Sequence, residues 1–537
     1  NAAFGTNTMQ RNTEGEENTA FGMQSMNQNT TGDANSALGS NALGNNTTGG
    51  NNTAVGKQAL NANTTASDNT ALGFCAMRCN TTGTRNVAVG CGALAANTTA
   101  DCNVAVGRAA LEVNTTGAEN TAVGNGGLGT NTTGCRNTAV GRSALVLNTT
   151  GIENVAVGRN TLDANTTGND NTAIGNSSLT TNTTGHSNTA AGKDALNQNT
   201  TGCHNTAIGL NSLYENTTAN NNTAVGYKAL EVNTTGASNT GVGKESLLVN
   251  TTGASNTAVG QSSLDANTTG SNNSAFGLNS LTSNTTGASN TGLGRSSLST
   301  NSTGTCNVAV GNNSMLQNTT GASNVAVGVF SLDANTTGAN NTAMGLCSLT
   351  TNTTNSNNTG FGFQSLKVTV GSNNTAVGRD AGGNNQGGNN GVFLGYTAGT
   401  DAVRNVTTGD NEIVIGNNSN SAAFIKIDWT VTSDLRDKTE IADVPYGLNF
   451  VNQITPIKYK FKTSREDETP TGFTRFGFKA QEILALEGDN PILVNNEDTD
   501  NLKLTGAYLV PVLVNAIKEL SETNKDLKSR IEALESN

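Results

Sequence analysis

Apolar and polar positions recur along residues 1–373 with a fixed period of seventeen residues. Asn opens each unit, from Asn1 through Asn18 to Asn358, and twenty-two units follow one another without insertion or deletion. Gly stands at position 5 and Leu or Met at position 9 of every unit, and Asn stands at position 12 of every unit except the one with Thr369. Self-similarity at a fixed period is the signature of a repeat architecture.

A unit of this length predicts one rung of a β-solenoid. The "TAVG" segment is short, β-branched and ends on Gly, which predicts a strand closed by a bend, and "NTTG" predicts a turn. We expect the core to consist of position 4 (Val, Ile, Leu or Phe), position 9 and the small residues at positions 3 and 8. So thin a core must be stacked on its neighbours, with Asn and Thr ladders along the axis. Twenty-two rungs spaced by about 4.8 Å would form a rod of roughly 100 Å.

The pattern changes twice towards the C-terminus. Residues 374–432 keep degenerate echoes such as "NNGVFLGYTAG", "NEIVIGNNSN" and "AAFIKIDWTVT", which predict short strands that cap the rod. From Ser433 on, all five Pro occur, only five of the 64 Gly remain, and 31 of 105 residues are charged, against 38 of 432 before. We therefore predict three parts: a shaft over residues 1–373, a cap over residues 374–432, and an α+β domain over residues 433–537.

The last part ends in a predicted helix over about residues 509–537. Its apolar residues are spaced alternately by four and three, which is a heptad seam with an Asn in its middle. The alternative is an amphipathic helix packed on its own domain. The seam consists of Leu513, Ile517, Leu520, Asn524, Leu527, Ile531 and Leu534.

Composition favours a fibre over a globular enzyme. Aromatic residues make up 4% of the chain, with one Trp, which is too few for a conventional core of this length. The net charge is −11 and basic residues are not clustered, so nucleic acid is not an expected partner. No apolar run is long enough to span a membrane, and no cofactor is expected. Because the sequence begins in mid-pattern, we expect an N-terminal anchor to the virion tail or capsid outside it.

Cysteine and histidine suggest one metal candidate. The eight Cys occupy variable positions and predict free thiols in a reducing cytoplasm. His186 and Cys203 are seventeen residues apart, and His204 follows directly, so these residues could face a shared transition metal. Solvent-facing variation is the interpretation we prefer, and no metal is expected. The recurring Asn-Thr-Thr matches the N-glycosylation pattern, but packing in a turn ladder explains it better.

Three C-terminal motifs carry a family resemblance: "SDLRDKTEIADVPYGLNFVNQITPIKYKFK", "RFGFKAQEI" and "LVPVLVNAIKELSETNKDLKSRIEALES". In this order they resemble the intramolecular chaperone domain of endosialidase tailspikes, which also occurs on phage tail fibres and neck appendages. The resemblance implies that the domain trimerises its fibre and then releases itself by autoproteolysis. It implies a Ser433 nucleophile and a Lys438 base, with Asp434 in support, and a scissile bond between Thr432 and Ser433.

The implied chemistry is consistent with the residue types. A Ser hydroxyl needs a base, and Lys serves as one when burial favours its neutral form. Ser433 and Lys438 could meet if the segment turns. Without the resemblance, a Ser-Asp helix cap with a surface Lys would be the simpler interpretation. Asp437 stands where many relatives carry an apolar residue, and a carboxylate there could keep Lys438 protonated and weaken cleavage.

The repeats also resemble, more loosely, the heads of trimeric autotransporter adhesins, whose strands end in Gly before a small residue. That resemblance implies a parallel β-roll with its apolar strand facing a three-fold axis. Both resemblances imply a parallel homotrimer. A thin-cored unit gains stability when it buries one face against two partners.

The function expected from these patterns is structural and adhesive. We expect a tailed-phage fibre, assembled in the host cytoplasm and carried on the virion, that contacts a host surface glycan or outer-membrane component. One alternative is a tailspike depolymerase, which needs two carboxylates about 5–10 Å apart; the acidic residues of the repeats, such as Glu112, Glu119, Glu153 and Asp163, form no recurrent column. Another is ice or mineral binding through stacked Thr, although adjacent Thr149 and Thr150 point to opposite faces of a strand.

Overall fold

The computed structural model describes residues 1–401, 404–420, 424, 426, 433–463, 465–489, 491–497 and 499–536. Contacts divide the chain into two compact units. One comprises Asn1–Val392 and Thr407–Glu412, and the other comprises Phe393–Val406 and Ile413–Asn537. No helix among the described residues is both long and apolar enough to cross a lipid bilayer.

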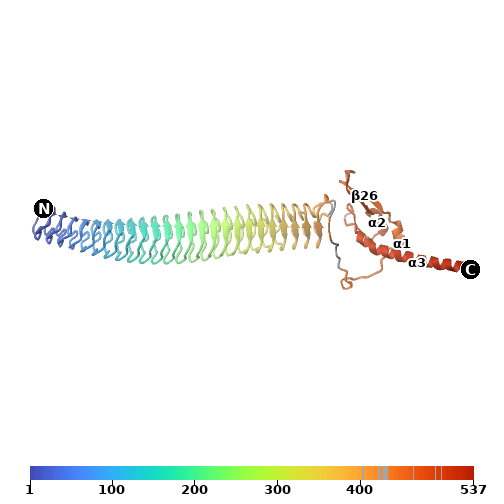
Figure 1. Ribbon diagram of the computed structural model, residues 1–537, viewed down its shortest axis with the longest axis horizontal. Coiled ribbons are helices and arrows are strands. Elements are labelled where there is room, and N and C mark those ends of the chain that lie inside the picture. Colours follow the sequence, from blue (N-terminus) through green and yellow to red (C-terminus); the bar gives the residue numbers. More distant parts are fainter. Residues whose placement is uncertain are drawn as a thin grey trace. The chain divides into compact units, whose positions relative to one another are not determined.

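The N-terminal unit is a parallel β-solenoid, as predicted, and Figure 1 shows its strands stacked side by side along the shaft. Each rung contributes one strand of three residues. The strands of the 25-stranded sheet are β1 (Ala2–Phe4), β2 (Thr19–Phe21), β3 (Ser36–Leu38), β4 (Thr53–Val55), β5 (Thr70–Leu72), β6 (Val87–Val89), β7 (Val104–Val106), β8 (Thr121–Val123), β9 (Thr138–Val140), β10 (Val155–Val157), β11 (Thr172–Ile174), β12 (Thr189–Ala191), β13 (Thr206–Ile208), β14 (Thr223–Val225), β15 (Thr240–Val242), β16 (Thr257–Val259), β17 (Ser274–Phe276), β18 (Thr291–Leu293), β19 (Val308–Val310), β20 (Val325–Val327), β21 (Thr342–Met344), β22 (Thr359–Phe361), β23 (Thr375–Val377), β24 (Val392–Leu394) and β25 (Ile413–Ile415).

The register follows the sequence period. From β1 to β22, strands pair in parallel seventeen residues apart, as in Thr138↔Val155. Thr359 of β22 pairs with Thr375, where the rung is one residue shorter. The Gly at position 5 follows each strand directly and has a backbone conformation that residues with a Cβ rarely adopt. At Gly311, for example, φ is +133°, and an added Cβ would lie 2.6 Å from the carbonyl oxygen of Gly328. The Gly column therefore allows the rungs to approach each other closely.

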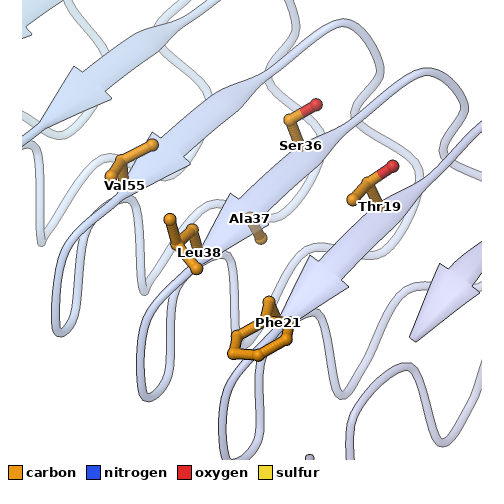
Figure 2. Close-up of a pocket in the computed structure, with 6 residues that line it drawn as sticks. All are labelled: Thr19, Phe21, Ser36, Ala37, Leu38 and Val55. Atoms are coloured by element: carbon orange, nitrogen blue, oxygen red, sulfur yellow. The ribbon is translucent and has the colours of Figure 1, made fainter. Parts of the chain in front are cut away.

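The core of the rung confirms three of the four predicted positions. The small residues at positions 3 and 8 and the Leu or Met at position 9 are fully buried in nearly every rung, as Ala139, Ala144 and Leu145 illustrate. The prediction for position 4 is wrong. Because side chains alternate along a strand, positions 2 and 4 point away from the core when position 3 points into it. Position 4 therefore lies outside, as Figure 2 shows for Leu38, which is 50% exposed.

Two Asn columns supply the predicted ladders. At position 1, Asn137 accepts the backbone N–H of Asn154 on its Oδ1 (3.0 Å) and donates from its Nδ2 to the carbonyl oxygen of Gly151 (2.9 Å). At position 12, the Asn148 Nδ2 donates to the Oδ1 of Asn131 (2.8 Å) and also to Gly151 (3.0 Å). Both columns are fully buried from the second rung on. The Asn of each Asn-Thr-Thr turn is thus packed in a hydrogen-bonded ladder, which agrees with the interpretation preferred above.

Positions 7, 9 and 17 have a left-handed backbone without being Gly. In one rung these are Ser143 (φ 55°), Leu145 (φ 51°) and Glu153 (φ 59°). A Leu at such a φ is unusual and strained. Burial of its side chain and the hydrogen bond from its backbone N–H to the carbonyl oxygen of Thr161 in the next rung (3.0 Å) hold it there.

The predicted cap continues the stack in part. β23, β24 and β25 lie within residues 374–432, and Thr375 donates its backbone N–H to the carbonyl oxygen of Gly391 (2.8 Å). The strand predicted from "AAFIKIDWTVT" lies outside the described residues, apart from positions 424 and 426.

The C-terminal unit combines several short helices and one long helix with two small antiparallel strand pairs. Its elements are η1 (Leu435–Asp437), α1 (Leu448–Gln453), β26 (Ile457–Lys462), β27 (Pro470–Gly477), α2 (Ala480–Glu487), β28 (Val494–Asn495), β29 (Lys503–Leu504), η2 (Gly506–Tyr508) and α3 (Leu509–Glu535). β26 pairs with β27, and β28 with β29. One buried cluster unites the helices with the second hairpin and consists of Phe450, Ile483, Leu493, Val494, Leu509 and Val512.

Candidate functional site

The turn that begins at Ser433 places the two predicted catalytic side chains in contact. The Nζ of Lys438 lies 2.8 Å from the Oγ of Ser433 and 3.3 Å from its carbonyl oxygen. The 3-10 helix η1 makes this possible, because it folds the five-residue interval back on itself. Both side chains are exposed in the single chain.

Asp434 shapes this turn through its contacts with Arg436. Its Oδ1 accepts the backbone N–H of Arg436 (2.9 Å) and so caps η1. The Arg436 side chain also holds the carboxylate, with Nη2 2.6 Å from Oδ2, and this guanidinium lowers the pKa of Asp434. The sequence interpretation missed Arg436. An Arg placed two residues after a capping Asp is the sequence signal that could have predicted this ion pair.

The carboxylate of Asp437 makes no described ion pair with Lys438. The described salt bridge of this segment joins Arg436 to Asp434 instead. Thr432, on the other side of the predicted scissile bond, lies outside the described residues. The geometry thus places a Ser hydroxyl and a Lys side chain in hydrogen-bond contact, on a turn fixed by an Asp–Arg pair.

The helix α3 presents two different faces. On one face Leu509, Val512 and Ala516 are buried against the domain. On the other, the apolar residues of the heptad seam are exposed by between 45% and 76%, from Leu513 to Leu534. Asn515 and Glu519 tie the helix to the domain: the Nδ2 of Asn515 donates to the carbonyl oxygen of Tyr446 (3.0 Å), and the Oε2 of Glu519 accepts the backbone N–H of Leu448 (2.6 Å). Packing on its own domain therefore accounts for one face and leaves the seam unpartnered.

Glu487 is a second anchor that the sequence interpretation missed. Its carboxylate is almost fully buried and accepts the backbone N–H groups of Ile492, Leu493 and Val494 at 2.7–3.0 Å. Such a carboxylate fixes the loop after α2, beside the buried cluster. Its sequence context, a Glu before Gly-Asp, offers no specific signal.

The metal candidate is not a metal site in the structure. His186 and His204 lie edge to face with ring centroids 5.0 Å apart, and the Cys203 sulfur lies 3.5 Å from the backbone nitrogen of His186. Within the described ranges, no group of three or more His, Cys, Asp or Glu side chains is arranged to hold a metal ion.

Three half-buried Asp at position 10 of their rungs have raised pKa values. Burial raises the pKa of Asp163, Asp265 and Asp333. They stand six and four rungs apart, which is about 29 and 19 Å at the usual strand spacing. These three do not form the close pair that glycoside hydrolysis requires.

Comparison with known proteins gives a family match in the first part of the C-terminal domain. Residues 433–489 match the family described as chaperone of endosialidase. Comparisons with curated proteins and with solved structures give no significant match. A β-solenoid shaft of 17-residue rungs followed by a chaperone of endosialidase domain fits a phage tail fibre with a C-terminal chaperone domain.

Proposed function

We propose that this chain is the shaft and maturation domain of a tailed-phage fibre that attaches the virion to a host surface glycan or outer-membrane component. The family match at residues 433–489 and the solenoid support a virion-associated fibre with its own chaperone. The single observation that carries the proposal is the helix α3, which packs one face on its domain and leaves a heptad seam exposed.

The seam is where three copies would assemble. A heptad repeat of apolar residues at alternating four and three spacing buries itself in a parallel helical bundle, and a polar residue such as Asn524 fixes its register. Lys525 and Lys528 line one shallow groove on α3 together with the seam residues Ile517, Leu520 and Asn524. Assembly at this end also solves a problem of the shaft, because nearly identical rungs can pair one unit out of register unless one end is aligned first.

The Ser433–Lys438 pair would release the chaperone once assembly is complete. The Ser433 Oγ attacks the carbonyl carbon of Thr432 while its proton passes to Lys438 Nζ, and the peptide C–N bond breaks as the Ser433 nitrogen takes up a proton. Water then hydrolyses the resulting ester, which leaves a carboxylate at Thr432 and a free amino group at Ser433.

Assembly would also control this step. A Lys acts as a base only in its neutral form, and a buried, water-poor site favours that form. The single chain leaves Lys438 and Ser433 exposed. We infer that neighbouring copies supply the burial, so that cleavage follows trimerisation.

The test is the intact mass and native mass of the full chain beside Ser433→Ala and Lys438→Ala. The expected result is a break at Thr432–Ser433 in the parent chain, none in either variant, and a trimeric shaft. Lys438→Arg, which keeps the charge but cannot be deprotonated, should also stay intact. Lys479→Ala, which removes an exposed Lys paired with Glu482 (2.5 Å), should cleave normally.

The other outcomes test autoproteolysis and trimer assembly separately. An intact trimer would remove the autoproteolysis and leave the chaperone. An intact single chain would contradict both, because the seam would then have no partner.

A further inference from the structure

Three side chains from two neighbouring rungs of the shaft meet at one carboxylate. Asn211 belongs to the rung that opens at Asn205, and Lys228 and Glu231 belong to the next rung. The Oε2 of Glu231 lies 3.1 Å from the Nζ of Lys228, and its Oε1 accepts a hydrogen bond from the Nδ2 of Asn211 (3.0 Å). One carboxylate thus holds an amine and a carboxamide side by side.

The stacking of the rungs fixes this arrangement. Asn211 and Lys228 both occupy position 7, so they are neighbours in one column, about 4.8 Å apart. Both have φ 57°, so their side chains leave the backbone in the same way. The backbone N–H of Lys228 donates to the carbonyl oxygen of Leu210 in the previous rung (3.0 Å). The two groups are therefore held together before any reaction, which removes most of the entropic cost of bringing them into contact.

The shared carboxylate is largely shielded from water. The side chain of Glu231 is 16% exposed, and that of Lys228 is 32% exposed. Glu231 occupies position 10 of its rung, and the same position holds Tyr214 in the rung before and Leu248 in the rung after, both partly buried. Such surroundings reduce the hydration that normally keeps a carboxylate and an ammonium charged, and so they make proton transfer between the two groups easier.

We propose that Lys228 and Asn211 form an isopeptide bond, with Glu231 carrying the protons. Glu231 takes a proton from the Lys228 ammonium, and the neutral Nζ attacks the Cγ of Asn211. The bond between Nζ and Cγ forms as the bond between Cγ and Nδ2 breaks. Nζ loses two protons in all, and both pass through Glu231 to Nδ2, which leaves as ammonium. The carboxylate of Glu231 is restored, and the two rungs are joined covalently.

The charged pair makes this reaction slow at neutral pH. The hydrogen bond and charge of Glu231 raise the pKa of Lys228, and the nearby Tyr227 and Glu245 act in the same direction. The neutral amine that attacks is therefore scarce near neutrality and becomes more abundant as the pH rises. We expect the bond to form faster in mildly alkaline solution.

The test is a tryptic peptide map of the full chain, read by mass spectrometry after incubation in mildly alkaline solution. Trypsin cleaves after Lys193, Lys228 and Lys244, and no other Lys or Arg lies between these residues. The bond would block cleavage at Lys228, because its amine becomes an amide. The expected product is one peptide over residues 194–244, lighter than its sequence by about 17 Da for the lost ammonia, in place of two peptides that meet at Lys228.

Two variants separate the chemistry from the packing. Glu231→Gln should give the two separate peptides, because an amide does not carry the protons between Nζ and Nδ2. Glu215→Gln is the matched control and should keep the joined peptide, because it changes an exposed carboxylate in the rung of Asn211.

The remaining outcomes would overturn the inference. Two peptides of unchanged mass from the parent chain would leave Lys228 and Glu231 as an ion pair. A loss of about 17 Da confined to residues 194–228 would show that Asn211 had closed on its own backbone as a succinimide. A joined peptide in Glu231→Gln would contradict the proton-carrying role of the carboxylate. None of these results depends on trimer assembly or on cleavage before Ser433.

Discussion

Replacing Asn137 with Ala tests whether the buried Asn ladder holds the rungs together. The Asn137 side chain is fully buried and makes contacts to three rungs. Its Nδ2 donates to Gly151 (2.9 Å) and to the Oδ1 of Asn120 (3.1 Å), and its Oδ1 accepts from the backbone N–H of Asn154 (3.0 Å).

The expected magnitude follows from which partners are left unpaired. Gly151 keeps the hydrogen bond from Asn148 (3.0 Å), and the Oδ1 of Asn120 keeps that from the backbone nitrogen of Asn137 (2.9 Å). The backbone N–H of Asn154 loses its partner. Leaving one buried donor unpaired costs about 1–3 kcal/mol, which corresponds to roughly 5- to 150-fold in an opening equilibrium.

Hydrogen exchange resolved by mass spectrometry measures this locally. Because each rung contacts only its neighbours, exchange in peptides covering residues 137–171 should accelerate by that factor while distant rungs keep their protection. Thr150→Ala, in the exposed turn of the same rung, should leave exchange unchanged. Unchanged protection in Asn137→Ala would refute the ladder as a stabilising element, and equal acceleration along the whole shaft would refute the nearest-neighbour reasoning.

Two further predictions concern single rungs. Gly311→Ala places a Cβ 2.6 Å from the carbonyl oxygen of Gly328 at φ +133°, and should destabilise the shaft by at least about 1–3 kcal/mol in denaturant unfolding; Gly127→Ala, where the nearest atom lies 3.7 Å away, is the control and should have no such effect. Asp333→Asn should raise the melting temperature at neutral pH, because burial raises the pKa of Asp333 and its Oδ1 lacks a hydrogen-bond partner. Since a raised pKa in the folded state makes ionisation unfavourable, the gain should disappear as the pH falls below the unfolded value of about 3.8; a gain that persists in acid would contradict this cause.

Most of the shaft follows from its sequence. The seventeen-residue period fixes the rung, the short strand before Gly fixes the sheet, and the Gly column marks the one place where two backbones approach too closely for a Cβ. In the C-terminal domain, the alternating apolar spacing predicts the helix, and Ser433 and Lys438 do meet.

The errors have physical causes. Position 4 is large and apolar, which predicts a place in the core, but Ala and Leu already fill the narrow rung. Because side chains alternate along the strand, Val140 and its counterparts lie outside. Hydrophobicity alone does not distinguish a buried position from an apolar position on the outward face of a strand. The left-handed backbone at Leu145 had no sequence signal either, because burial and a hydrogen bond to the next rung hold it there rather than its own preference.

The uniform register of the rungs makes the length of the shaft a heritable variable. Each rung is bonded only to the one before and the one after, so one whole unit can be gained or lost in frame while every remaining contact is kept. Near-identical coding segments are also substrates for unequal recombination. The stack also accepts smaller changes in rung length. One rung is a residue shorter, where Thr359 pairs with Thr375. Another is longer, because the backbone nitrogen of Asn389 bonds to Asp410, which lies 21 residues further along the chain. Lineages with this architecture should therefore differ in reach by steps of about 4.8 Å, and the C-terminal domain would need no matching change.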